Sequence, residues 1–527
     1  MSVKVLVSDK LAPVGLAILE AAQGLEVTSL PGLSPSELLD VIGEYDGLVI
    51  RSGTRVTAEL IERAERLRVI GRAGIGVDNV DVEAASKRGV VVMNTPGGNN
   101  VTTAEHAISM MLAVARHIPQ ANASLRAGKW ERSAFVGTEV SGKTLGVVGV
   151  GNIGSIVADR AKGLTMHVIA FDPFLTPDAA ARLGIELVSL EELYARSDFI
   201  SVHTPLTQET RGLIGRNSFT RMKKGVRVVN CARGGIVDEA ALLDALESGQ
   251  VAGAALDVFA SEPPAPDSAL IAHPAVVATP HLGASTGEAQ LNVAIAVAEQ
   301  VRDFLLADEV RNAINMPSVS QEAAGALAPY ILLAERLGKF QSQLSDGAPS
   351  EITVEFRGEV ADLDCRPLTS AVLKGLLSGV LDVPVNAVNA PYLAKERGVK
   401  VVEMRDQDAT SFASSIRVTF NGGGGADLIE GAVFDGHIVR VVRFNDFFLE
   451  TVPEGNILVL HNRDVPGVVG SVGCFLGEQG VNIGGFVLGR VGGEAVSFVH
   501  MDSPLAPEQL ESLRQVAGIT SAQMVSL

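Results

Sequence analysis

The chain has 527 residues, 47% of them apolar and 20% charged, and its formal net charge is −18. This length predicts about three or four domains, and the negative charge argues against non-specific binding to nucleic acid or to an anionic membrane. The three cysteines, Cys231, Cys365 and Cys474, are far apart, which argues against a disulfide framework and favours a reducing cytoplasm. We expect neither a signal peptide nor a membrane span.

The first part of the chain alternates short apolar runs with amphipathic segments. Strands are predicted at residues 3–7, 48–50, 69–70 and 90–93, with helices such as 36–42 and 58–66 between them. This alternation is typical of a small doubly wound α/β domain with a parallel sheet.

Two turns in this part follow strand ends, where open α/β sheets bind ligands. One contains Arg51, Ser52 and Gly53, and the next contains Gly74 and Gly76. These residues could hold the carboxylate or phosphate of a substrate. The alternative is a pair of tight turns with a solvated arginine.

A helix is predicted at residues 100–116, and a strand–turn–helix–strand unit follows at 144–172. The turn of this unit has the G-x-G-x-x-G pattern, with glycines at 149, 151 and 154. Gly149 would permit a tight turn, Gly151 would let the backbone approach a pyrophosphate, and Gly154 would let the helix pack closely on the strand. The alternative is an accidental glycine-rich turn.

An acidic residue stands where such a unit would bind a ribose. Asp172 lies 18 positions after Gly154 (172 − 154 = 18), close to the position from which a carboxylate can bind a ribose 2'-hydroxyl. The same carboxylate would repel a 2'-phosphate. The sequence therefore predicts NAD rather than NADP as the cofactor.

The strand pattern continues at residues 199–202, 226–230, 251–256 and 276–278, and each strand ends in polar residues. The carboxyl ends of parallel strands meet in one crevice, so these residues should face the nicotinamide. Oxidation of a 2-hydroxy acid needs a base, a cation for the carboxylate and a hydride acceptor. We predict His281 as the base, Glu262 as the group that favours its protonated form, and Arg233 as the carboxylate ligand.

Each of these three assignments has a plainer alternative: a loop histidine, a solvated glutamate and a solvated arginine. Cys231 could be a nucleophile, but a small buried filler is more typical of a strand end. The nine histidines show no paired metal-ligand spacing, so no metal is predicted.

Four segments of this part resemble the D-isomer-specific 2-hydroxyacid dehydrogenases. They are Gly149-Val150-Gly151-Asn152-Ile153-Gly154, Asn230-Cys231-Ala232-Arg233-Gly234-Gly235, Leu256-Asp257-Val258-Phe259 and Thr279-Pro280-His281-Leu282-Gly283-Ala284. The resemblance implies that Arg233 binds substrate, that His281 is the acid/base and that Glu262 is its partner, in a cleft between two domains that closes by a hinge. It also implies NAD contacts from Gly149, Gly151, Asn152, Ile153, Gly154, Asp172, Thr204, Cys231, Ala232, Arg233, Asp257, His281, Leu282, Gly283 and Ala284.

The C-terminal third begins after Pro317, with a helix predicted at 327–338 and a strand at 352–356. Residues 366–377 and 388–398 resemble the intervening domain of the long-form D-3-phosphoglycerate dehydrogenases. Residues 421–425 form a glycine-rich turn, interpreted as a hairpin loop rather than a phosphate cradle.

The last part, residues 456–527, has a βαββαβ pattern typical of a ferredoxin-like fold. The segments around Asp464 and Asn482 resemble the ligand turn of an ACT domain, which implies that these two residues bind an amino-acid effector. The alternative is a purely structural dimerisation sheet.

The expected fold class is α/β: two doubly wound, Rossmann-like domains followed by an α+β intervening domain of the allosteric substrate-binding type and a ferredoxin-like ACT domain. We expect residues 1–98 together with 286–316 to form the substrate-binding domain and residues 99–285 to form the NAD-binding domain. Residues 317–454 are expected to form the intervening domain, and residues 455–527 the regulatory ACT domain. The expected substrate-binding residues are Arg51, Ser52, Gly53, Gly74, Gly76 and Arg132.

The family resemblance implies NAD-dependent oxidation of 3-phosphoglycerate to 3-phosphohydroxypyruvate, the entry to serine synthesis, in a cytoplasmic homotetramer inhibited by serine. Two alternatives remain. One is a dehydrogenase for another 2-hydroxy acid such as glyoxylate, which would leave the two C-terminal domains without a role. The other is a non-catalytic NAD-sensing regulator on the same fold.

Overall fold

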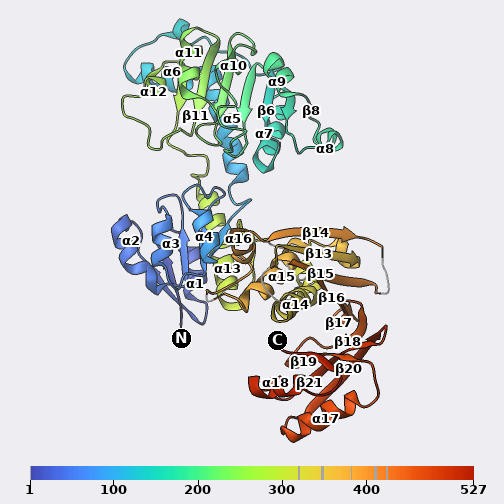
Figure 1. The fold of residues 1–527 in the computed structure, drawn as a ribbon. Coiled ribbons are helices and arrows are strands. Elements are labelled where there is room, and N and C mark those ends of the chain that lie inside the picture. Colours follow the sequence, from blue (N-terminus) through green and yellow to red (C-terminus); the bar gives the residue numbers. More distant parts are fainter. Residues whose placement is uncertain (1, 318–320, 346–348, 382, 409–411, 423–424) are drawn as a thin grey trace.

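The computed structural model describes residues 2–317, 321–345, 349–381, 383–408, 412–422 and 425–527. Two glycines of the predicted turn at 421–425 lie outside this range, so that prediction is not tested. The described chain contains four sheets, arranged in an elongated molecule with the first sheet between the second and the third (Figure 1). Within the described residues, none of the helices combines the length and apolar character needed to cross a membrane.

The first sheet has five parallel strands in the order β2-β1-β3-β4-β5. Its strands are β1 (Val3–Val7), β2 (Leu25–Ser29), β3 (Gly47–Ile50), β4 (Val69–Arg72) and β5 (Val91–Asn94). Its helices are α1 (Pro13–Glu20), α2 (Pro35–Val41), the 3-10 turn η1 (Ile42–Glu44), α3 (Ala58–Arg63) and α4 (Val82–Arg88). Apolar cores lie on both faces of the sheet, which confirms the doubly wound prediction.

The second sheet has seven parallel strands in the order β12-β11-β10-β9-β6-β7-β8. These are β6 (Thr144–Val148), β7 (His167–Phe171), β8 (Glu186–Leu187), β9 (Phe199–Val202), β10 (Val226–Asn230), β11 (Val251–Leu256) and β12 (Val276–Ala278). The helices are α5 (Asn100–Arg116), α6 (Ile118–Arg126), η2 (Arg132–Phe135), α7 (Asn152–Gly163), α8 (Pro177–Arg182), α9 (Leu190–Arg196), α10 (Arg216–Phe219), α11 (Glu239–Glu247) and α12 (Ala269–Ala272). Helices α5 and α7 cover one face, and α9 and α11 cover the other.

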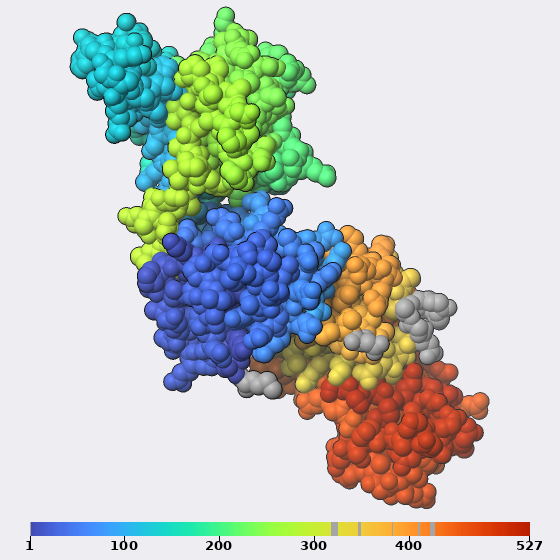
Figure 2. Space-filling view, turned by 90° about the vertical axis from the view of Figure 1, so that its left-hand side faces the viewer, coloured from blue at the N-terminus to red at the C-terminus, as the bar shows by residue number. Residues whose placement is uncertain are grey.

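The chain then returns to the first sheet through α13 (Gly287–Ala307), which packs on α1 and β4. The backbones approach closely there, because a methyl group on Gly15 would lie 2.7 Å from the carbonyl oxygen of Ala294. After α13, residues 308–317 run beside β5, where Ala313 bridges Met93 and the Ile314 amide donates to the carbonyl of Val92 at 2.7 Å. We call residues 308–317 the strap. The bodies built on the first two sheets meet across a narrow waist (Figure 2).

The third sheet is mixed, with the order β14-β13-β15-β16-β17-β18. Its strands are β13 (Glu351–Gly358), β14 (Lys400–Asp406), β15 (Ser414–Gly422), β16 (Gly425–Phe434), β17 (Ile438–Phe444) and β18 (Phe447–Thr451). Its helical elements are α14 (Gln321–Leu344), η3 (Glu359–Asp362), α15 (Arg366–Ser378) and α16 (Ala390–Glu396). Helices α14 and α15 touch through glycines: a methyl group on Gly375 would lie 2.0 Å from the carbonyl oxygen of Glu335.

The fourth sheet is antiparallel, with the order β20-β21-β19-β22, and has the predicted ferredoxin-like topology. Its elements are β19 (Asn456–Arg463), α17 (Val468–Glu478), β20 (Ile483–Val491), β21 (Glu494–Met501), α18 (Pro507–Arg514) and β22 (Ile519–Ser526). It shares one core with the third sheet, since Phe340 of α14 stacks on Phe498 of β21 with ring centroids 5.3 Å apart. The predicted division between residues 454 and 455 therefore crosses a common core.

The glycine contact between α14 and α15 gives a stability prediction. Gly375→Ala would place a methyl group 2.0 Å from a backbone carbonyl that no side-chain rotation can move, so the helices must separate, at a cost of roughly 1–3 kcal/mol. We expect a lower urea midpoint for the unfolding of this part of the chain.

Gly473→Ala is the matched control. Gly473 lies inside α17, and a methyl group there meets nothing within 4 Å, so replacement should stabilise the helix by roughly 0.5–1 kcal/mol. Equal urea midpoints for the two variants would contradict the close packing of α14 on α15.

Candidate active site

The turn after β6 contains three glycines. Gly149 and Gly154 lie in close contact with other backbone atoms, whereas Gly151 faces open space. Gly149 has φ +89°, and a methyl group there would lie 2.8 Å from the carbonyl oxygen of His203. A methyl group on Gly154 would lie 2.0 Å from the carbonyl oxygen of Gly149, whereas one on Gly151 would meet nothing within 4 Å. The open side at Gly151 leads to the N-terminus of α7, whose unpaired N–H groups and positive dipole end favour a phosphate.

Asp172 follows β7 and fixes this turn. Its carboxylate accepts the amide of Val150 at 2.8 Å and the amide of Phe174 at 2.8 Å. The residue is half-buried, so the carboxylate keeps an exposed side. Its predicted contact with a ribose is compatible with this geometry, and it also holds the glycine turn in place.

His281 and Glu262 form the predicted pair. Nδ1 of His281 lies 2.6 Å from Oε2 of Glu262, and the two side chains are 49% and 38% exposed. The other carboxylate oxygen of Glu262 accepts the Phe259 amide at 3.1 Å, which fixes the glutamate. With Nδ1 occupied, Nε2 is the ring nitrogen left to exchange a proton with a ligand in the cleft.

Asp257 holds the turn that carries His281. Its side chain is fully buried and accepts hydrogen bonds from the Leu282 amide at 2.7 Å, the Gly283 amide at 2.8 Å and the Thr279 hydroxyl at 2.6 Å. His106 of α5 adds a contact at 3.2 Å. Burial alone would raise the pKa of Asp257, but the hydrogen bonds, that of His106 first, bring the pKa below its ordinary value.

These groups open onto a cavity of about 430 Å³ between the first two sheets, a size typical of small-molecule sites. The first sheet contributes Arg72, Ile75, Gly76 and Asp78. The second sheet and its connections contribute Asn99, Asn100, Thr103, Asn152, Ile153, His203, Thr204, Pro205, Leu206, Cys231, Ala232, Arg233, His281, Gly283 and Ala284. The structure thus brings most predicted catalytic and cofactor residues to one cleft.

Several buried polar atoms in this cleft lack hydrogen-bond partners within the described part of the chain. They are Nε of Arg72, Oδ1 of Asn99, Oδ1 of Asn100 and Oγ1 of Thr204. Buried polar groups are normally paired. The cleft therefore fits a ligand with many hydrogen-bonding groups, as a dinucleotide and a hydroxy acid have.

Two arginines, Arg72 of the first sheet and Arg233 of the second, line the cleft. Arg233 binds Asp78 through Nε at 2.9 Å and the carbonyl of Ala232 at 2.7 Å, which joins the second sheet to the first. Arg72 is largely buried, and this burial, followed by the nearby charge of Arg233, lowers its pKa to about 10. The sequence analysis did not select Arg72, although it ends an apolar strand, which is the signal that selected Arg51.

The predicted substrate-binding residues other than Gly76 lie outside this cavity. The Arg51 amide donates to Asp9 at 2.6 Å, its guanidinium donates to the carbonyl of Lys10 at 3.2 Å, and Ser52 and Gly53 are exposed in the turn that follows. Gly74 is next to the lining residue Ile75, and its amide donates to Thr95 at 2.7 Å. Arg132 is exposed on η2, on the body of the second sheet. Cys231 is buried, which raises the pKa of its thiol and disfavours a nucleophilic role.

The chain is similar to known dehydrogenases along its whole length. The family described as "D-isomer specific 2-hydroxyacid dehydrogenase, NAD binding domain" matches residues 108–283, and the "D-3-phosphoglycerate dehydrogenase intervening domain" matches residues 326–445. The D-3-phosphoglycerate dehydrogenase of Synechocystis sp. is 44% identical over 99% of this chain and 95% of its own length. That of Archaeoglobus fulgidus is 43% identical over 99% of this chain and 100% of its own length.

Solved structures resemble the first two sheets. An NAD+-bound 3-phosphoglycerate dehydrogenase of Entamoeba histolytica is 31% identical, with a TM-score of 0.51, over 60% of this chain and 100% of that one. A glyoxylate reductase of Paecilomyes thermophila is also 31% identical, with a TM-score of 0.55, over 59% of this chain and 98% of that one. The protein is an NAD-dependent oxidoreductase and belongs to the D-3-phosphoglycerate dehydrogenase family of D-isomer-specific 2-hydroxyacid dehydrogenases.

Proposed function

We propose that this protein oxidises 3-phospho-D-glycerate to 3-phosphohydroxypyruvate, the entry to serine synthesis. The observation that carries the proposal is the cleft in which the His281–Glu262 pair and two guanidinium groups, those of Arg72 and Arg233, surround one cavity. Relatives named D-3-phosphoglycerate dehydrogenase extend over the whole chain, including the third and fourth sheets. The solved glyoxylate reductase and the solved 3-phosphoglycerate dehydrogenase cover 59% and 60% of the chain, so it is the full-length relatives that favour phosphoglycerate over glyoxylate.

In the proposed mechanism Arg233, His281 and Glu262 have separate roles. Arg233 binds the substrate carboxylate and places C2 in the cleft. His281 takes the proton of the C2 hydroxyl at Nε2, and Glu262 stabilises the imidazolium that results. NAD, when bound, would supply the acceptor for the hydride from C2. These roles agree with the contact of 2.6 Å between His281 and Glu262.

The residues proposed to hold NAD lie on the second sheet. The open glycine turn and the N-terminus of α7 would hold the pyrophosphate, with Asn152 and Ile153 at the start of the helix. Asp172 would bind the adenosine ribose, and Thr204, Cys231 and Ala232, which line the cleft, would contact the cofactor. Leu282, Gly283 and Ala284 close the site, held by the carboxylate of Asp257.

A phosphorylated acid approaches a chain whose net charge is −18, so cations must gather where the phosphate binds. We propose that Arg72 is the cation that binds the phosphate inside the cleft. The two neighbouring turns, with Arg51, Ser52 and Gly53 in one and Gly74 and Gly76 in the other, would complete the substrate site. Arg132 is exposed on η2 and does not line the cleft, so in this proposal it serves a neighbouring subunit. A homotetramer with such contacts is part of the proposal.

The predicted division of the chain is also part of the proposal. Residues 1–98 and 286–316 hold the substrate, residues 99–285 hold NAD, residues 317–454 form the intervening domain and residues 455–527 form the regulatory ACT domain. A cytoplasmic location agrees with three free cysteines.

Feedback by serine is the regulatory part of the proposal. Asp464 pairs with Arg490 at 2.6 Å, and Asn482 donates to Asp502 at 2.9 Å. A bound amino acid would exchange with these partners, offering its ammonium to Asp464 and its carboxylate to Arg490. The outer strands β20 and β22 leave sheet edges that a second copy can extend, so the sites would lie between subunits.

The substrate is tested by initial rates of NADH formation with 3-phospho-D-glycerate and with D-glycerate. At low substrate concentration, we expect turnover only with the phosphorylated acid.

The role of Arg72 is tested by replacing it. Arg72→Met should raise the KM for phosphoglycerate about 10- to 100-fold, because one charge-assisted hydrogen bond is lost. The KM for NAD should stay nearly unchanged. Arg55→Met, at an exposed position, is the control. Absence of turnover, or faster turnover of D-glycerate, would contradict the proposed substrate.

The acid/base role is tested by replacing the histidine. His281→Ala should lower kcat by about 100- to 10,000-fold, because no other group takes the hydroxyl proton, while NAD binding measured by fluorescence titration stays close to wild type. His437→Ala removes an exposed histidine of the third sheet and should leave kcat unchanged. A reduction below tenfold for His281→Ala would exclude it as the base.

Serine regulation is tested with a point variant, because cutting the chain before Asn456 would expose the core shared by Phe340 and Phe498. Asp464→Ala should raise the serine concentration for half inhibition about tenfold or more, because one charge-assisted contact is lost. Asp446→Ala is the control: it removes a carboxylate that is 85% exposed and should leave that concentration unchanged. If inhibition by serine is absent from wild type or unchanged in Asp464→Ala, the fourth sheet is structural.

A further inference from the structure

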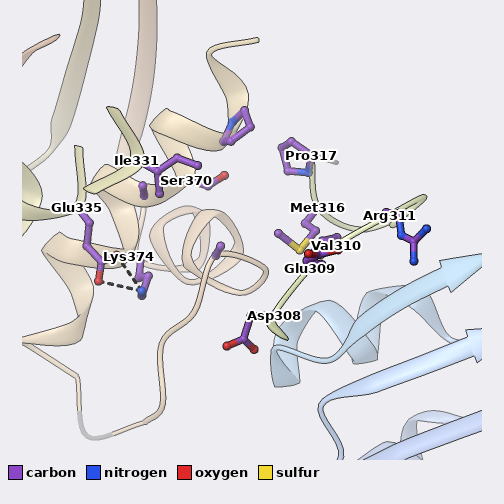
Figure 3. A pocket seen from close by; sticks show the side chains of 13 residues that line it. Asp308, Glu309, Val310, Arg311, Met316, Pro317, Ile331, Glu335, Ser370 and Lys374 are labelled. Carbon is purple, nitrogen blue, oxygen red and sulfur yellow. Dashed lines mark hydrogen bonds and ion pairs between the residues drawn. The ribbon is translucent and has the colours of Figure 1, made fainter. Parts of the chain in front are cut away.

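A second cavity of about 480 Å³ lies between the strap and helices α14 and α15 (Figure 3). It is separate from the cleft, because the two cavities have no lining residue in common. Its wall is largely apolar, formed by Val310, Met316 and Pro317 of the strap, Ile331 of α14 and Pro367 of α15. Such a cavity with a few polar groups is typical of a small-molecule site.

The polar end of this cavity is an ion pair. Nζ of Lys374 lies 2.8 Å from one carboxylate oxygen of Glu335 and 2.9 Å from the other, and each side chain is 34% exposed. Ser370 lies one helical turn before Lys374 on α15, and its hydroxyl points toward Pro317 (Figure 3). A ligand can therefore reach an ammonium, a carboxylate and a hydroxyl at the same end of an apolar wall.

The other charged groups around the cavity have partners elsewhere or face solvent. Arg311 pairs with Asp303, Asp308 pairs with Arg68 at 2.6 Å, and Glu309 is exposed. A ligand with a single charge would pair with one member of the Lys374–Glu335 bridge and leave the other without a partner. A zwitterion satisfies both, with its carboxylate on Lys374 and its ammonium on Glu335.

We propose that this cavity binds a free α-amino acid with an apolar side chain. The zwitterionic end exchanges with the Lys374–Glu335 pair, and the side chain lies on Met316, Ile331 and Pro367. The proposal does not depend on the substrate of the cleft or on serine binding at the fourth sheet.

The strap links this cavity to the cleft through a single strand. Asn315 accepts the amide of Val92 in β5 at 2.9 Å. At the end of β5, the side chain of Asn94 donates to the carbonyl of Ile75 at 2.6 Å, and Ile75 lines the cleft. A ligand that moves the strap should therefore change substrate affinity, and by linkage substrate should change the affinity of that ligand equally.

Binding is tested by calorimetric titration of the full chain with L-leucine, L-methionine and L-phenylalanine. We expect at least one of them to bind. The corresponding molecules without the ammonium (4-methylpentanoate) or without the carboxylate charge (leucinamide) should bind about tenfold more weakly or worse, because each loses a charge-assisted contact. No heat from any amino acid at millimolar concentration, or binding of both analogues as tightly as L-leucine, would overturn the proposal.

Variants locate the site. Lys374→Met should weaken binding about tenfold or more, and the neutral pair Glu335→Gln/Lys374→Met gives the same test if the single variant folds poorly. Lys400→Met is the control, since Lys400 forms a comparable bridge to Glu351 at 2.6 Å on another part of the third sheet. Loss of binding in Asp464→Ala, or unchanged binding in both Lys374 variants, would place the ligand elsewhere and overturn the inference. A KM for phosphoglycerate that a saturating amino acid leaves unchanged would overturn the link to the cleft.

Discussion

The buried carboxylate of Asp257 is the constraint on which the active cleft depends. A carboxylate with no exposed surface is costly unless its oxygens are hydrogen-bonded, and Asp257 meets this need with the amides of Leu282 and Gly283 and the hydroxyl of Thr279. Those donors belong to the turn on either side of His281. The geometry that stabilises the buried charge therefore also fixes the position of His281, the proposed base. His106, from the helix that enters the second body, ties the same carboxylate to α5.

The cleft is shared between two sheets that lie far apart in sequence. The second sheet supplies the glycine turn, the histidine pair and Arg233, while the first supplies Arg72 and Asp78. The ion pair between Arg233 and Asp78 is a contact across the cleft, and at 30% and 70% side-chain exposure it is open to water and to exchange with a ligand. In the proposed mechanism a substrate carboxylate replaces Asp78 on Arg233, which would couple substrate binding to the relative position of the two bodies. This is consistent with a narrow waist about which the bodies could close (Figure 2).

Local patterns predicted much of this from the sequence. Strands buried on both faces, such as β3 and β5, appear as continuous apolar runs, and α5 was predicted with its observed limits. Strand β2 was missed because it is an edge strand without a buried residue, and its sequence shows no apolar run. Glu262 and His281 were found because both stand in recognisable loops. Arg72, Asp78 and His106 were not predicted as site residues. Asp78, for example, contacts Arg233, which lies 155 positions later in the sequence, and no local pattern indicates such a contact. The shared core of the third and fourth sheets was missed for the same reason: each sheet has a complete pattern of its own.

We propose that the cleft between the first two sheets is where a hydride leaves C2 of the substrate and a proton leaves the C2 hydroxyl. A crystal structure of the protein with NADH and 3-phospho-D-glycerate tests it most directly. We predict that C2 of the substrate lies between the nicotinamide and His281, with the C2 hydroxyl about 3 Å from Nε2, the carboxylate on Arg233 and the phosphate near Arg72. A substrate bound outside this cleft, or in it with His281 beyond hydrogen-bond reach of the C2 hydroxyl, would contradict the account.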